Sequence, residues 1–169
     1  MSKSGLYGGV GKLATGERFF EWPNRETLSQ LDAGSRIDTI TFRGGDALCS
    51  LNWQYTNMVR SPNFGQQLTV GTSAQTQGLK FPRGPIPLIE VKVFGSGQEN
   101  GYVQSVKFVA AGDDRTSPES LGLNTYGKNK LLAGESIEKV HVEPNVFIIG
   151  FYGVTSINDG RFKCIGFIY

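Results

Sequence analysis

Hydrophobic residues recur with a two-residue period in several short segments, which is the pattern of β-strands. Residues 37–43 are rich in β-branched and aromatic side chains, end at a Gly-Gly-Asp turn signal at 44–46, and are followed by a returning strand at 47–55. In residues 88–94, apolar side chains alternate with charged ones, and a second apolar strand follows at 102–109. The pattern therefore predicts two antiparallel hairpins.

Further strands are predicted towards the C-terminus. Residues 136–142 and 145–152 are predicted to pair with each other around Glu143 and Pro144, and residues 161–169 form a last strand. No segment shows a sustained 3.6-residue apolar period, so no long helix is expected. Turn signals about every 8–12 residues are typical of an all-β barrel, sandwich or prism. The irregular segments, which are expected to hold loops and edge strands, are residues 59–87 and 112–130.

The composition agrees with one all-β domain. A chain of 169 residues can bury a core of its own and shows no linker that would divide it. Its 23 glycines are about double the usual share of roughly 7%. A glycine surplus without a Gly-X-Y repeat indicates many tight turns between short strands.

The charge distribution limits the class of partner. The net charge of +2 and the scattered lysines and arginines give no basic patch for a nucleic acid. No stretch approaches the roughly 20 apolar residues that span a bilayer, so membrane insertion is not expected. Because the sequence starts without an apolar leader, a cytoplasmic location is expected, with non-classical secretion left open.

Few residues are candidates for catalysis or metal binding. His141 is the sole histidine and stands on a predicted strand, and no Cys-x-x-Cys occurs, so neither a metal site nor a cofactor is expected. No nucleophile signature accompanies the histidine, so the chain is not expected to be an enzyme. Cys49 and Cys164 are expected to be buried free thiols, although a disulfide between them stays open. Trp22 and Trp53 are expected in the core rather than as platforms for a sugar.

The glycine-rich stretch at residues 5–16 suggests a phosphate-binding loop at first sight. A P-loop requires Gly-x-x-x-x-Gly-Lys-Ser/Thr, in which backbone N–H groups surround the phosphates and the hydroxyl binds magnesium. Aligning Gly11 and Lys12 with that pattern puts Leu6 at the first glycine and Leu13 at the hydroxyl. A nucleotide-binding role is therefore excluded.

A different family matches this stretch. The sequence Gly-Leu-Tyr-Gly-Gly-Val-Gly at 5–11 resembles the N-terminal glycine loop of jacalin-related lectins, where an aromatic residue precedes Gly-Gly-x-Gly. Residues 88–95 and 101–108 are similar to two strands of that family. Residues 148–153, Ile-Ile-Gly-Phe-Tyr-Gly, and 164–167, Cys-Ile-Gly-Phe, are similar to its C-terminal motifs. The resemblance spans roughly residues 5–168.

The resemblance implies a β-prism I of three four-stranded antiparallel sheets with pseudo-threefold symmetry, forming a single jacalin-like lectin domain over residues 1–169. It also implies a non-catalytic carbohydrate site in loops at one end of the prism. Such a site needs convergent donors and acceptors for hydroxyl groups, and glycines that let the backbone approach the sugar. The residues that the resemblance places in this site are Gly8, Gly9, Gln98, Glu99, Asn100, Ser156, Asn158, Asp159, Gly160 and Lys163.

The chain departs from the family in its last loop. The family motif Gly-x-x-x-Asp-x-Ile-Gly has an aspartate that accepts hydrogen bonds from the sugar, and Lys163 stands at that position here. Asp159 or Asn158 can replace the acceptor, or residues 158–160 can be only a tight turn. The lysine also suggests a preference for acidic glycans.

Two functions therefore stay open. The first is a lectin that binds glycans, with the sugar unknown and a homo-oligomer allowed. The second is a protein-interaction or assembly module that has kept the prism and lost the sugar site, for example in a toxin or defence system.

Overall fold

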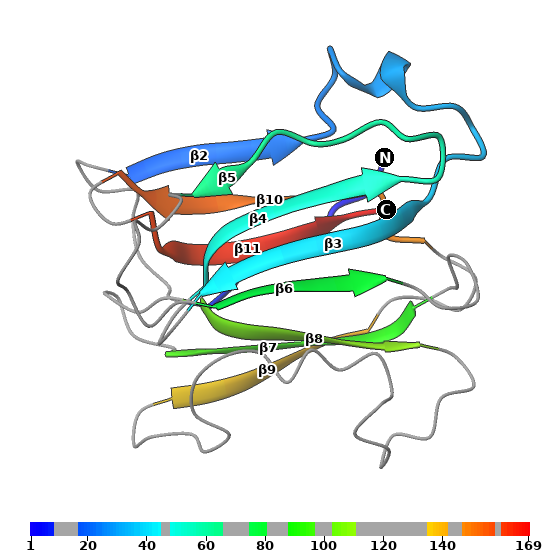
Figure 1. The fold of residues 1–169 in the computed structure, drawn as a ribbon. Helices are drawn as coiled ribbons and strands as arrows, with labels where there is room; N and C mark the ends of the chain where they lie inside the picture. The colour runs from blue at the N-terminus through cyan, green and yellow to red at the C-terminus, as the bar shows by residue number, and fades with distance from the viewer. Residues whose placement is uncertain are drawn as a thin grey trace.

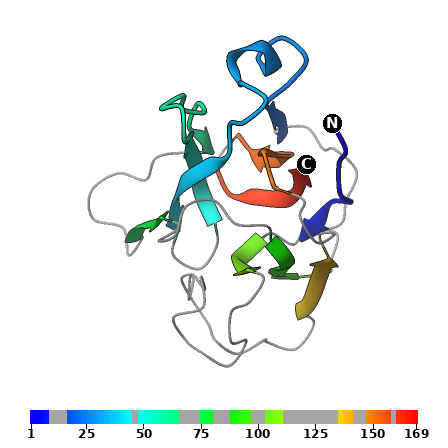
Figure 2. The same ribbon diagram turned by 90° about the vertical axis from the view of Figure 1, so that its right-hand side faces the viewer.

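The computed structural model describes residues 1–8, 17–44, 48–65, 75–80, 88–96, 103–110, 135–141, 147–157 and 160–169, and all structural statements concern these residues. Within them the chain is all-β and antiparallel, and its one helical element is the short 3₁₀ turn η1 (Leu28–Gln30). The strands form three sheets that face one another around a common core (Figures 1 and 2). The predicted fold class, all-β, is confirmed.

The first sheet joins the two ends of the chain. Its strand order is β1 (Tyr7–Gly8), β11 (Phe162–Ile168), β10 (Gly150–Ser156) and β2 (Glu17–Trp22). The backbone N–H of Ser2 donates to the carbonyl of Tyr169 at 2.6 Å, and the N–H of Tyr169 donates back at 2.9 Å. Strands β1 and β2 were not predicted from the sequence.

The second and third sheets each contain one of the predicted hairpins. The second has the order β5 (Phe64–Gly65), β4 (Leu48–Tyr55), β3 (Ile37–Gly44) and β6 (Gln75–Lys80). Its edge strands, β5 and β6, come from residues 59–87, as expected. The third has the order β8 (Val103–Ala110), β7 (Leu88–Ser96) and β9 (Glu135–His141). Four strands in this sheet, and the pseudo-threefold symmetry, stay predictions.

One predicted pairing is wrong. Residues 136–142 and 145–152 were expected to pair with each other, but β9 pairs with β7, and β10 pairs with β11 and β2. The chain crosses from the third sheet to the first between them, and β10 begins only at Gly150. Alternation identifies a strand but does not identify its partner.

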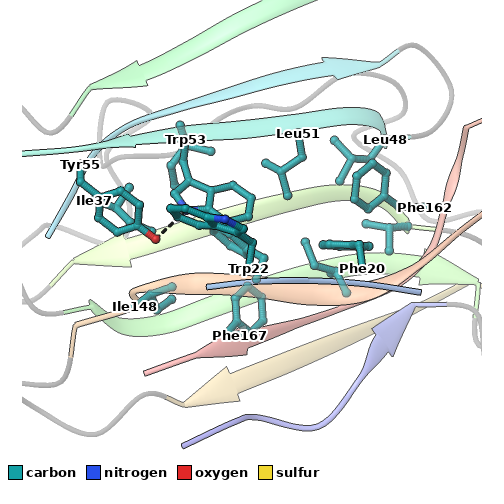
Figure 3. Close-up of a cluster of buried hydrophobic side chains, with 14 residues drawn as sticks. Phe20, Trp22, Ile37, Leu48, Leu51, Trp53, Tyr55, Ile148, Phe162 and Phe167 are labelled. Atoms are coloured by element: carbon teal, nitrogen blue, oxygen red, sulfur yellow. Dashed lines mark hydrogen bonds between the residues drawn. The ribbon is translucent and has the colours of Figure 1, made fainter. Parts of the chain in front are cut away.

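Aromatic side chains from the first two sheets dominate the core (Figure 3). Trp22 is 5% exposed and Trp53 is 1% exposed, which confirms both as core residues. Their rings meet edge to face, with centroids 5.9 Å apart. Full burial of such side chains stabilises the fold by roughly 1.5–3 kcal/mol each.

Polar groups in the core are paired across the sheets. The indole Nε1 of Trp53 donates to the hydroxyl of Tyr55 at 2.9 Å (Figure 3). That hydroxyl donates in turn to the carbonyl of Ile149. This chain of hydrogen bonds links β4 of the second sheet to the segment that enters β10. Cys49 and Cys164 are buried, as expected, and are not joined in a disulfide. Over the described ranges, no helix has the length and apolar character needed to cross a bilayer.

Candidate functional site

Gly8 lies where three segments of the chain meet. It pairs with Cys164 across β1 and β11 and has a φ of +120°, a conformation that favours glycine. A Cβ atom at this position would lie 2.8 Å from Cγ2 of Val103 and 2.9 Å from the carbonyl oxygen of Lys163. A side chain cannot fit there, so the glycine is required by both its conformation and its neighbours.

Each residue of this contact borders one of the predicted site loops. Gly8 precedes residues 9–16, Val103 follows residues 97–102, and Lys163 lies in β11 directly after the β10–β11 turn. Figure 1 shows β2 beginning, β10 ending and β11 beginning at one end of the molecule. The structure therefore brings together the borders of all three segments at one end of the fold.

Four of the ten predicted site residues are among those described. Gly8, Ser156, Gly160 and Lys163 all lie at this end. The other six lie outside the described residues and stay predictions: Gly9, Gln98, Glu99, Asn100, Asn158 and Asp159.

Two hydrogen bonds join the described residues on either side of the β10–β11 connection. The N–H of Gly160 donates to the carbonyl of Ser156 at 2.9 Å, and the N–H of Ser156 donates to the carbonyl of Arg161 at 2.9 Å. Gly160 has a φ of +70°, as closing turns of this kind need. The sequence predicted a strand at 145–152, but β10 begins at Gly150 and continues to Ser156. The predicted end was wrong because Gly153 does not stop the strand and pairs with both Ile165 and Phe20.

Lys163 is the extra residue of a β-bulge. Val154 pairs with Cys164 and Thr155 pairs with Phe162, so Lys163 has no partner in the β10–β11 ladder. A bulge redirects the side chain of the extra residue. The Nζ atom of Lys163 lies 3.9 Å from Oε1 of Glu17.

Glu17 is a further candidate residue at this end of the fold, which the sequence analysis missed. It is the first residue of β2, pairs with Ser156, and directly follows the glycine-rich stretch. Its side chain is 15% exposed and that of Lys163 is 27% exposed, so both are partly accessible. A carboxylate is thus present beside the position where the family carries its aspartate. The sequence signal that could have identified Glu17 is its position as a charged residue immediately after the glycine stretch.

The segment before the glycine stretch is anchored on the first sheet. The hydroxyl of Tyr152 donates to the carbonyl of Ser4, and the N–H of Phe167 donates to the Ser4 hydroxyl at 2.8 Å. Lys3 pairs with Glu21 at 2.8 Å and lies over the Tyr152 ring. Burial raises the pKa of Tyr152 above its ordinary value. These contacts fix the approach of the chain to Gly8.

Among the residues that the structure describes, no group of three histidine, cysteine or acidic side chains is placed to hold a metal ion. Cys164 lies beside Gly8 but is buried, and burial raises the pKa of its thiol. A protonated, buried thiol is a poor nucleophile.

Solved structures with the same fold are jacalin-related lectins. A mannose-specific jacalin-related lectin from Morus nigra, solved with mannose, matches with a TM-score of 0.61 and 20% identity over 98% of this chain and 92% of that chain. Artocarpin, solved with mannotriose, gives a TM-score of 0.59 and 19% identity over 98% and 95%. A mannose-binding jacalin-related lectin from Ananas comosus gives 0.58 and 18% over 98% and 94%.

These comparisons define the class of fold. No protein-family model matches the sequence, and no curated protein sequence matches it either. The chain has the β-prism fold of jacalin-related lectins, so the resemblance seen in its motifs is confirmed in its three-dimensional structure as a jacalin-like domain.

Proposed function

We propose that this protein is a non-catalytic lectin, formed as one β-prism domain by residues 1–169, and that it binds glycans at the end where Gly8, Val103 and Lys163 meet. The observation that carries the proposal is the contact at Gly8, which places the borders of three loops against one another. The similarity in fold to lectins solved with mannose and mannotriose supports the same function.

The chemistry of this end suits a sugar. Backbone N–H groups of the glycine stretch that follows buried Gly8, beginning with Gly9, can approach hydroxyl oxygens closely, because glycine has no side chain to obstruct them. Glu17 offers carboxylate oxygens that accept from sugar hydroxyls, in place of the aspartate that Lys163 replaces. Asp159 is the other candidate for this acceptor. Neutral hexoses of the mannose type are therefore the first ligands to test.

A glycan array with the purified protein tests the proposal, run beside Asp159→Ala, Lys163→Ala and Glu17→Gln. Binding that weakens in any of these variants places the site at this end. Uniform binding by all four proteins would place the sugar elsewhere.

The second candidate is a protein-interaction or assembly module. Two observations favour it: Lys163 stands where a sugar acceptor would be, and Phe19 is 53% exposed on β2, an edge strand of the first sheet. Two results together would support this function instead. No glycan on the array would bind, and light scattering would show a dimer or larger assembly that Phe19→Ser converts to monomer.

A further inference from the structure

A hollow of about 300 Å³ opens at the same end of the molecule, between the first and second sheets. Strands β2 and β5 and the β10–β11 turn form its walls, and neither Gly8, Val103 nor Lys163 lines it. It is therefore separate from the contact at Gly8. The lining residues used below are Arg18, Asn63, Phe64 and Ser156.

Strand parity places Arg18 at the mouth of the hollow. Arg18, Phe20 and Trp22 occupy the same face of β2, and the latter two are buried in the core. Arg18 continues that face past the end of the core, where its side chain is exposed. Over the ranges described, no carboxylate lines the hollow and Arg18 takes part in no ion pair. The guanidinium of Arg18 is therefore available to bind an anionic group of a ligand.

Asn63 contributes a second, fixed donor. Its Oδ1 accepts from the Ser50 hydroxyl at 2.8 Å and from Nδ2 of Asn52 at 3.0 Å. Because both bonds engage the amide oxygen, the two N–H groups of the amide nitrogen are left to donate to a ligand. In the described part of the structure, this nitrogen has no acceptor.

Phe64 gives the hollow an apolar wall. Its half-buried ring stacks on buried Phe20, with centroids 4.9 Å apart and 29° between the planes. The next residue, Gly65, has a φ of +84° and passes so close to the carbonyl of Cys49 that a Cβ atom would clash with it. The backbone therefore fixes the ring beside two donors.

We propose that this hollow is a second carbohydrate subsite, selective for a sugar unit that bears a carboxylate. The carboxylate meets the Arg18 guanidinium and the Asn63 amide, one apolar face of the ring lies on Phe64, and a ring hydroxyl donates to the backbone carbonyl of Ser156. A volume of about 300 Å³ is at the lower end of the roughly 300–1,000 Å³ typical of ligand pockets, which suits a single monosaccharide.

The inference rests on the proposed lectin function and deepens it. The sequence analysis linked a preference for acidic glycans to Lys163, but the ammonium of Lys163 lies 3.9 Å from the Glu17 carboxylate. The inference assigns this preference to Arg18 instead. A neutral hexose would occupy the hollow without an acceptor that matches the guanidinium.

The test compares methyl β-D-glucuronide with methyl β-D-glucoside, which differ only in the carboxylate, and includes the methyl glycoside of N-acetylneuraminic acid. Binding is followed by amide chemical shifts in ¹H–¹⁵N spectra. At low salt, we expect one or both acidic sugars to bind about tenfold more tightly than the glucoside, because charge-assisted hydrogen bonds are about twice as strong as neutral ones. The shifts should centre on Arg18, Asn63 and Ser156.

Two variants and one control give the result its meaning. Arg18→Gln should abolish the difference between glucuronide and glucoside, whereas Arg25→Gln should keep it, because Arg25 is an exposed arginine in the connection that follows the far end of β2. Asn63→Asp keeps the acceptor for Ser50 and Asn52 but replaces the amide donor with a negative charge. It should fold normally and lose acidic sugars. The glucuronide and neuraminic acid arms distinguish the two sources of carboxylate.

Equal affinity for glucuronide and glucoside overturns the inference, and so does a carboxylate preference that survives Arg18→Gln. If the array detects neutral glycans at Gly8 while both acidic probes fail to shift the hollow, the lectin function stands and the second subsite is wrong. If no glycan binds at all, both proposals fail together.

Discussion

The ammonium of Lys163 lies 3.9 Å from the carboxylate of Glu17, joining the bulge of β11 to the first residue of β2. Strand β10 separates these two strands in the sheet, so the pair spans it on the surface. The negative charge that the sequence lacks at position 163 is therefore supplied from a strand nearly 150 positions away in the chain.

Glu17→Gln should weaken binding of neutral hexoses about tenfold or more, because a hydrogen bond to a charged acceptor contributes about 1.5–3 kcal/mol. The free energy of unfolding should change by less than about 1 kcal/mol, since the ion pair is partly exposed. Titration calorimetry and denaturant unfolding measure the two effects. Glu26→Gln, at an exposed glutamate on the connection between β2 and β3, is the matched control. Unchanged binding in Glu17→Gln would remove Glu17 from the site.

Gly8→Ala should destabilise the protein by about 1–3 kcal/mol, the cost of forcing a side chain into a positive φ, and contact with Val103 and the Lys163 carbonyl adds to it. Gly34→Ala is the control, because a Cβ atom there would have no heavy atom within 4 Å. Urea unfolding of the two variants gives the comparison. Equal stability of both would contradict the close contact at Gly8.

Tyr55→Phe should lower the free energy of unfolding by about 1–3 kcal/mol, because it leaves the Trp53 indole N–H and the Ile149 carbonyl without their hydrogen-bond partner. The ring keeps its shape, so near-ultraviolet circular dichroism should stay native. A loss of stability near zero would show that solvent replaces the hydroxyl.

Stability should also decline at alkaline pH. Burial raises the pKa of Tyr55, so its phenol stays protonated in the folded state while the unfolded chain ionises near pH 10. The contribution of Tyr55 is therefore fully present below about pH 10 and is lost as the pH rises further, by about 1.4 kcal/mol per pH unit. Burial also raises the pKa of Cys164 and Tyr152, which adds to the decline.

The free energy of unfolding is measured at a series of pH values from 7 upward, for the native protein and for Tyr55→Phe. The difference between the two proteins gives the contribution of Tyr55 to the pH dependence. Above pH 10 the free energy of unfolding of the variant should fall less steeply with pH, by up to about 1.4 kcal/mol per pH unit, because one fewer proton is released on unfolding. Parallel curves for the two proteins would mean that Tyr55 ionises as readily in the folded state as in the unfolded one.

The hairpins were predictable because their information is local. Residues 37–55 contain both strands and the Gly-Gly-Asp turn between them, and the structure pairs them as β3 and β4. Strand β2 was not predicted, since buried Phe20 stands beside exposed Phe19 and charged residues surround both. The pairing of β9 with β7 and of β10 with β2 could not be read from alternation, because these partners lie far apart in the sequence.

The residues of the candidate site also fall into two groups, those that the sequence could predict and those that it could not. Gly8 was predictable from its motif, because a close backbone approach demands glycine and leaves a visible signature. Glu17 could be found only through its pairing with Ser156, and Arg18 and Asn63 only through the meeting of two sheets. Ordinary polar residues of this kind carry no motif.

The pairing of residues 1–22 with residues 150–168 limits the order in which the sheets can form during synthesis. In the described part of the structure, β1 and β2 have no strand partners other than β11 and β10. Residues 1–22 leave the ribosome before residues 150–168, so their ladders cannot form until residues 150–168 have been translated. The hairpins β3–β4 and β7–β8 need no such delay. The sheet that carries Gly8, Glu17 and Lys163 is thus the last to be completed, and contacts of such long sequence separation make its formation slow.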